Sequence, residues 1–469
     1  MLERFKNVDL HPDKIDNPTM GTIFEELIRK FNEALNENPG EHFTPRDVVH
    51  LMVELLLAGD EKRIGRAGAV VTVCDPCCGS GGMLTIAKEH IAEGARKAGV
   101  LVRQPINPGA DVHLFGQEVN PETFAVCKSD LFMKSADGRD AERILFGSTL
   151  SNDRHAGVSF DYLIANPPYG KDWKRDQDDV RAEHERGMAG RFGPGLPRIS
   201  DGQLLFLLHM LAHRKEPKVG GARIAIIMNG SPLFTGDAGS GESEIRRWIL
   251  ENDWLEALIA LPEQLFYNTG IATYVWVLTN RKAPARRGKV QLIDARSLWV
   301  PMRKSLGDKR REIGDGTEGK PDHVAEIVAL HRGFAEGERV RIYPTTHFGF
   351  RKIWVERPLR LNFQVSAERI ARVAARTASP SPTPSSGTPR ACRFRTASRS
   401  FSPGRWFPTC LTRGSTSRSA TARTGRWESS ATRSISTATS TSTCRRGRWG
   451  RSRRKSRRSR RTSCGCWRR

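Results

Sequence analysis

A strand, a glycine-rich turn and a helix follow one another between residues 70 and 87, an order typical of doubly wound α/β sheets. Val70–Cys74 is a β-branched run typical of a buried strand. The turn Asp75–Met83 follows, and Leu84–Ala87 begins the helix. Such a turn lets a backbone approach a nucleoside cofactor, because glycines lack a Cβ atom: here Gly79, Gly81 and Gly82. Neither the G-x-G-x-x-G spacing nor a phosphate loop is present, so phosphate binding is the weaker interpretation.

Further apolar runs, separated by helical patterns, predict a mostly parallel sheet of seven strands in an α/β, doubly wound fold. The predicted strands lie at about 70–74, 113–118, 143–147, 160–165, 223–229, 256–261 and 274–280. Helices are predicted over Ile23–Leu35, Asp47–Leu57 and Glu244–Leu250. Residues 171–202 form a charged, glycine-rich segment, interpreted as a long functional loop. Ligands of such sheets bind at the carboxyl ends of strands.

The segment Asn166-Pro167-Pro168-Tyr169 directly follows the predicted strand at 160–165. Both prolines lack an N–H group, so this stiff backbone offers only acceptors beside the Asn166 side-chain oxygen. The aromatic ring of Tyr169 comes next. Two acceptors can hold a planar NH2 group while the ring stacks on the heterocycle that carries it. The alternative is a simple turn at the end of a strand, which Asn-Pro and Pro-Pro dipeptides often mark.

Glu118 ends the predicted strand that follows the glycine turn by one β-α unit. A carboxylate at this place can accept hydrogen bonds from ribose hydroxyls. A solvated loop acid is the alternative interpretation. The order of the segments favours the ribose role.

These segments together resemble the adenine-N6 DNA methyltransferases that use S-adenosylmethionine. More narrowly, residues 8 to 370 resemble the modification (methyltransferase) subunit of type I restriction-modification systems. The most specific matches are Glu41–Arg46, Asp75–Met83, Gly116–Glu118, Asn166–Tyr169, Arg191–Gly195 and Leu265–Gly270. The order of the motifs, with Phe43-Thr44-Pro45 first, is that of the adenine-N6 class.

The resemblance implies S-adenosylmethionine as cofactor and duplex DNA as substrate, with the target adenine flipped out of the duplex. The implied cofactor-binding residues are Glu41, His42, Phe43, Thr44, Pro45, Arg46, Asp75, Gly79, Ser80, Gly81, Gly82 and Glu118. The implied catalytic residues are Asn166, Pro167, Pro168 and Tyr169. Asn166 and the Pro167 carbonyl would hold the adenine amine, and Tyr169 would stack on the base. The implied partners are a specificity subunit, which joins two modification subunits, and a restriction subunit.

Two features of the sequence depart from this family. Its subunits begin with a sizeable helical domain, of which residues 1–40 resemble only the end. Ser148 stands where the family often has Asp near the adenine or the cofactor base. A truncated, impaired remnant of such a subunit is therefore one alternative. A methyltransferase acting on RNA or on protein glutamine is another, since the Asn-Pro-Pro-Tyr segment also suits an amide nitrogen.

The net charge of +24 comes almost entirely from residues 376–469, which hold 23 Arg, one Lys and a single acid, Glu428. This low-complexity Arg/Ser-rich tail is typical of a GC-rich gene read out of frame, and it has too few Leu, Ile and Val residues to bury a core. We expect it to be disordered; a nucleic-acid-binding tail is the alternative. Residues 1–375, which contain the methyltransferase domain at 41–370, carry 52 basic and 51 acidic side chains, so DNA affinity must come from local patches or a partner.

No metal site is expected, because Cys74, Cys77 and Cys78 lie on a strand end and the cofactor turn with no second Cys/His pair at ligand spacing. No signal peptide or apolar run of membrane-spanning length was found in the sequence. We therefore expect a cytoplasmic protein with reduced thiols.

Overall fold

The structure is a computed structural model that describes residues 44–354 apart from 98–99, 136–137 and 268, together with short strands at 361–362, 383–384, 391–394 and 400–401. The chain divides into two units, one holding residues 1–353 and 393–404 and the other residues 354–392 and 405–469. The predicted helix Ile23–Leu35, the helical remnant 1–40 and the segment Glu41–Phe43 lie outside the described residues, as does most of the tail.

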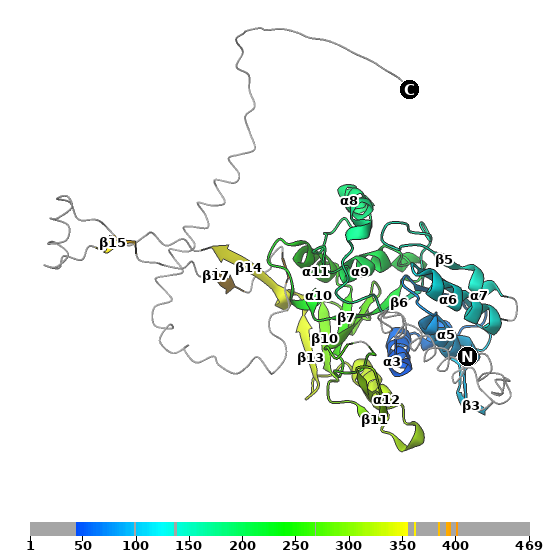
Figure 1. Cartoon of the computed structure of the whole chain (residues 1–469). Helices are drawn as coiled ribbons and strands as arrows, with labels where there is room; N and C mark the ends of the chain where they lie inside the picture. The colour runs from blue at the N-terminus through cyan, green and yellow to red at the C-terminus, as the bar shows by residue number, and fades with distance from the viewer. Residues whose placement is uncertain are drawn as a thin grey trace, which may run out of the picture. The chain divides into compact units, whose positions relative to one another are not determined.

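A nine-stranded sheet forms the centre of the first unit, in the order β13-β10-β8-β9-β7-β6-β1-β4-β5 (Figure 1). Its strands are β1 Val70–Asp75, β4 Asp111–Glu118, β5 Ile144–Phe146, β6 Tyr162–Ala165, β7 Arg223–Asn229, β8 Leu255–Ala260, β9 Thr273–Thr279, β10 Lys289–Asp294 and β13 Val340–Pro344. All seven predicted strands are confirmed. The sequence missed β10 and β13, which extend the sheet at one edge.

The sheet is mostly parallel. Only β9 and the edge strand β13 run against their neighbours. The central strands β6, β8 and β9 are buried along their whole length, as expected for a sheet covered on both faces. From β1 the chain proceeds outward through β4 to β5, then returns to β6 on the other side of β1. This reversal makes the carboxyl ends of β1 and β6 the point where such sheets bind ligands.

Helices cover both faces of the sheet. In Figure 1, α9 and α11 lie on one side, and α3 and α12 lie on the other. Helix α3 packs against α5, α12 and β7, whereas α9 packs on β7. The helices are α3 Arg46–Leu57, α4 Glu61–Ile64, α5 Gly82–Lys88, α6 Pro121–Lys134, α7 Arg139–Glu142, α8 Gln177–Glu185, α9 Gln203–Ala212, α10 Ser231–Phe234, α11 Gly241–Glu251 and α12 His323–Gly333. The predicted helices at 47–57 and 244–250 are confirmed.

Residues 171–202 are not the plain loop that was predicted. They contain α8 between two single-turn 3-10 helices, η3 Lys174–Asp176 and η4 Gly187–Ala189. Only Val180 of α8 is buried, so this helix lacks the apolar face that would have shown it in the sequence.

The described residues also form smaller elements. They are the π-helix η2 Glu89–Glu93, the 3-10 helices η5 Pro217–Val219, η6 Pro284–Arg286, η7 Thr317–Gly319 and η8 Thr345–Phe348, and the strands β2 Ala95–Lys97, β3 Val100–Arg103, β11 Val300–Leu306, β12 Lys309–Glu312, β14 Gly349–Trp354, β15 Leu361–Asn362, β16 Thr383–Pro384, β17 Ala391–Phe394 and β18 Ser400–Phe401. Within the second unit, β15 pairs antiparallel with β16. Across the described residues, we find no helix with the length and apolar character needed to cross a bilayer.

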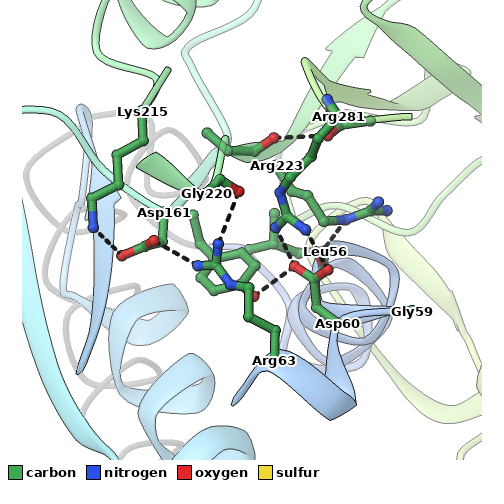
Figure 2. Close-up of polar contacts among 12 residues, drawn as sticks. Leu56, Gly59, Asp60, Arg63, Asp161, Lys215, Gly220, Arg223 and Arg281 are labelled. Atoms are coloured by element: carbon green, nitrogen blue, oxygen red, sulfur yellow. Dashed lines mark hydrogen bonds and ion pairs between the residues drawn. The ribbon is translucent and has the colours of Figure 1, made fainter. Parts of the chain in front are cut away.

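A network of charged side chains joins elements at the amino ends of the parallel strands, the edge opposite the glycine turn (Figure 2). Asp161, just before β6, accepts hydrogen bonds from Arg63 at 2.5 Å and from Lys215 at 2.6 Å. Asp60 accepts from Arg281 through both carboxylate oxygens, and from the Tyr162 hydroxyl at 2.7 Å. These buried carboxylates are therefore paired, as burial requires.

Candidate active site

The glycine turn leaves β1 at Asp75 and enters α5 at Gly82. Gly81 has a φ of 82°, a conformation that favours glycine. A Cβ atom at Gly81 would lie 2.8 Å from the sulfur of Cys127 on α6. The missing side chain thus makes room for α6. Gly79 is also in the left-handed region, with a φ of 55°, and Ser80 between them is half-buried.

Glu118, at the end of β4, has a carboxylate held by three backbone N–H groups. Gly79 donates to Oε2 at 2.9 Å, while Val119 and Asn120 donate to Oε1 at 3.0 and 2.8 Å. Two carboxylate oxygens have about four lone-pair sites, so acceptor capacity remains. The Gly79 contact ties the acid to the glycine turn, which brings these two predicted cofactor segments together.

Asp75 is buried beneath the turn and accepts a hydrogen bond from the Cys77 N–H at 3.0 Å. Burial raises the pKa of the Asp75 carboxyl to about 7, and the nearby charge of Glu118 acts in the same direction. Two acids at the base of this turn favour a ligand that carries positive charge.

The Asn166 amide is fixed from both ends. Its Nδ2 donates to Thr44 Oγ1 at 2.8 Å, and its Oδ1 accepts from the Tyr169 hydroxyl at 2.5 Å. Thr44 directly precedes Pro45, which caps the start of α3, and Arg46 is the first residue of that helix. The segment that contains Thr44 therefore meets the Asn-Pro-Pro-Tyr turn, although the sequence assigned Thr44 to the cofactor.

Tyr169 is half-buried. Its ring makes a T-shaped contact with Phe266, with 5.8 Å between ring centroids and an interplanar angle of 87°. Pro167 is buried and Pro168 is half-buried in the same turn. Strand β6 pairs parallel with β1, with Leu163 opposite Cys74. The turn after β6 and the glycine turn after β1 are thus neighbours.

Apolar side chains that the sequence did not single out lie beside Glu118. Val119 is 43% exposed and Phe146, at the end of β5, is 49% exposed. Phe146 is opposite Glu118 in the register of β5 on β4, and its ring contacts Phe124 of α6. Half-exposed apolar surface next to the acid that is predicted to bind ribose suits the base of a nucleoside.

Within the described residues, one group of side chains lies close enough together to hold a metal ion: Asp153, His209 and His213. Hydrogen bonds already use His209 Nδ1, both ring nitrogens of His213 and one carboxylate oxygen of Asp153. Arg191 Nη1 lies 2.9 Å from His209 Nδ1, which must accept because a guanidinium only donates. His213 Nε2 lies 2.8 Å from Asp153, and its Nδ1 lies 2.6 Å from the Val158 carbonyl oxygen. We assign no metal to this group.

The chain matches a family model described as N-6 DNA methylase over residues 15–314. It is 25% identical over 338 residues to the type I restriction enzyme MjaIX methylase subunit of Methanocaldococcus jannaschii. This match covers 72% of this chain and 53% of that protein. It is 28% identical over 293 residues to the HindI methylase subunit of Haemophilus influenzae, or 62% of this chain and 57% of that protein.

The solved structure of a type I restriction-modification system methyltransferase subunit from Streptococcus thermophilus is similar, with a TM-score of 0.54 and 25% identity. The similarity covers 74% of this chain and 64% of that one. The chain spans about half the length of the curated relatives that it matches. Since the family model covers more than half of the sequence, this chain belongs to the N-6 DNA methylase family.

Proposed function

We propose that this protein transfers the methyl group of S-adenosylmethionine to the N6 amine of an adenine in duplex DNA, as the modification subunit of a type I restriction-modification complex. The proposal rests on the adjacency of the Asn166–Tyr169 turn and the glycine turn, which follow the neighbouring parallel strands β6 and β1. Membership of the N-6 DNA methylase family supports it. The names of the relatives, which are methylase subunits of type I restriction enzymes, support the place in a complex.

The residues present fit the cofactor. Gly79 and Gly81 hold the turn in left-handed backbone conformations. Glu118 would accept hydrogen bonds from the ribose hydroxyls, and Val119 and Phe146 would offer apolar surface to the base of the cofactor. The bound cofactor would supply an activated methyl group on a sulfonium, so the reaction needs no metal.

Asn166 would act on the adenine amine, whose lone pair is delocalised into the ring. One lone pair of Asn166 Oδ1 accepts from Tyr169, which leaves the other for an N6 hydrogen. The Pro167 carbonyl is the second acceptor in the proposal. Positive charge develops on N6 during transfer, so acceptors that are already in place stabilise the transition state more than the ground state. The adenine has to leave the duplex to reach them.

A partner should supply DNA affinity and sequence recognition. Residues 1–375 carry 52 basic and 51 acidic side chains, so non-specific attraction to the phosphate backbone is weak. A specificity subunit bound to two such chains is the proposed arrangement, to which a restriction subunit can be added.

The test compares Asn166→Ala with wild type in the presence of the specificity subunit. We expect Asn166→Ala to abolish methylation of duplex DNA while its affinity for S-adenosylmethionine stays near that of wild type, measured by isothermal titration. Asn252→Ala is the control. Asn252 is exposed and lies between α11 and the amino end of β8, whereas Asn166 follows the carboxyl end of β6. Full activity in Asn166→Ala would refute the assigned role.

Two further substrates distinguish the proposed function from the alternative functions. Single-stranded RNA and a glutamine-containing peptide are offered as substrates in the same assay. Methylation of either one in preference to duplex DNA would replace the proposed substrate. Cofactor binding without turnover on any substrate would support an impaired remnant.

A further inference from the structure

The loop that follows β5, residues 147–152, lies against both proposed cofactor-binding segments. Gly147 donates its N–H to the Glu118 carbonyl at 2.9 Å. Gln117 donates from Nε2 to the carbonyls of Asn152 at 2.7 Å and Gly147 at 3.2 Å. The buried Thr149 hydroxyl donates to the carbonyl of Pro76 in the glycine turn. A displacement of this loop would therefore move the walls of the cofactor pocket.

Arg191 holds the same loop from the other side. Its Nη1 donates to the Thr149 carbonyl at 2.7 Å and its Nη2 donates to the Leu150 carbonyl at 3.0 Å. The other donors go to Glu183 of α8 and to His209 of α9. All five N–H groups of the guanidinium are thus used, and the Arg191 side chain is only 11% exposed.

The residues that follow Arg191 help to fix the position of its guanidinium. The guanidinium lies 4.7 Å from the ring centroid of the fully buried Phe192. A Cβ atom at Gly193 would lie 2.2 Å from the Gly187 carbonyl oxygen, so only glycine lets the chain fold back this closely. The motif Arg191–Gly195, which the proposed chemistry leaves without a role, therefore serves to place one guanidinium.

We infer that Arg191 is a positioning residue for the cofactor pocket, and this inference rests on the proposed function. Through Thr149 it supports the glycine turn, and through Glu183 it ties α8 to the same loop. Helix α8 belongs to the segment that directly follows the Asn166–Tyr169 turn. Cofactor binding and the stability of α8 are therefore linked, because both depend on where the guanidinium holds the loop.

The experiment measures S-adenosylmethionine affinity by isothermal titration and amide hydrogen exchange over residues 177–185, with and without cofactor. Arg191→Lys keeps the charge but loses the planar fork, and Thr149→Val keeps the shape but loses the hydroxyl. Arg198→Lys is the matched control in the same segment, because Arg198 is half-exposed and its guanidinium contacts Ser231 rather than the loop. Thermal unfolding of each variant shows whether it folds.

We expect Arg191→Lys and Thr149→Val each to weaken cofactor affinity about tenfold, and the double variant to be weakened about tenfold rather than about a hundredfold, because the two residues act through one chain of contacts. Cofactor should slow exchange in α8 of wild type and Arg198→Lys but not of Arg191→Lys. Wild-type affinity in folded Arg191→Lys and Thr149→Val, or additive losses in the double variant, would overturn the inference. Failure of the wild type to bind cofactor would instead refute the proposed function.

Discussion

Thr44 Oγ1 accepts a hydrogen bond from Asn166 Nδ2 at 2.8 Å, across 122 positions of the chain. This contact decides which way the Asn166 amide points. With Nδ2 bound to Thr44, Oδ1 is the atom left to face a substrate amine, which must donate to it. Thr44 therefore orients the acceptor on which the proposed chemistry depends.

Thr44→Val should lower the single-turnover rate of methyl transfer about tenfold, the effect of losing one hydrogen bond of about 1 kcal/mol or slightly more at the transition state. Thr44→Ser keeps the hydroxyl and should retain most of the rate. Both variants should bind S-adenosylmethionine with nearly wild-type affinity. If Thr44→Val kept its rate but bound cofactor weakly, Thr44 would have the cofactor role that the sequence assigned to it.

Gly81→Ala should weaken cofactor binding for a reason inside the protein. The added Cβ would meet the Cys127 sulfur at 2.8 Å, and the φ of 82° would strain any residue with a side chain. A left-handed conformation costs about 1–2 kcal/mol outside glycine, so we expect an affinity loss of about tenfold by isothermal titration. Adding Cys127→Ala should recover part of the loss. Gly109→Ala, at an exposed glycine with ordinary backbone angles, is the control.

The sequence predicted seven of the nine strands and placed both turns at carboxyl ends of strands, because continuous apolar runs and glycine and proline spacing are local signals. It missed β10 and β13, whose partly exposed residues weaken the apolar pattern. It also missed α6, which buries only three residues, although Asn120 and Pro121 mark its start. The partners of Thr44, Tyr169 and Arg191 could not be predicted, because each contact joins side chains whose distance depends on the complete fold.

Asp60→Asn should destabilise the fold by about 3 kcal/mol in urea unfolding at pH 7, because it leaves the largely buried Arg281 without its carboxylate. The neighbouring pair Glu61–Arg332 is exposed, so Glu61→Gln should change stability by less than about 0.5 kcal/mol. Burial opposes the ionisation of Asp60, but Arg281 outweighs it and lowers the pKa of this carboxyl. Equal stabilities of Asp60→Asn and wild type at pH 7 would exclude a stabilising role for this pair.

The Asp60–Arg281 pair should also make the free energy of unfolding depend on pH. A carboxyl with a lowered folded-state pKa stabilises the protein above its unfolded pKa of about 3.9, and the contribution is lost as the pH falls through the folded value. The difference in unfolding free energy between wild type and Asp60→Asn should therefore be constant above about pH 5 and shrink in acid. A difference that grew on acidification would contradict this assignment.

S-adenosylmethionine affinity should rise between pH 6 and pH 8, because the pKa of Asp75 in the ligand-free protein is about 7. Below that pH the buried carboxyl is protonated and neutral; above it the carboxylate attracts the sulfonium and ammonium charges of the cofactor. Binding favours the ionised form, so it should release a proton near pH 7, seen as a buffer-dependent enthalpy in isothermal titration. Asp75→Asn cannot ionise, so its affinity should be lower at pH 8 and nearly independent of pH. If the wild-type affinity were flat across this range, the charge of Asp75 would have no part in cofactor binding.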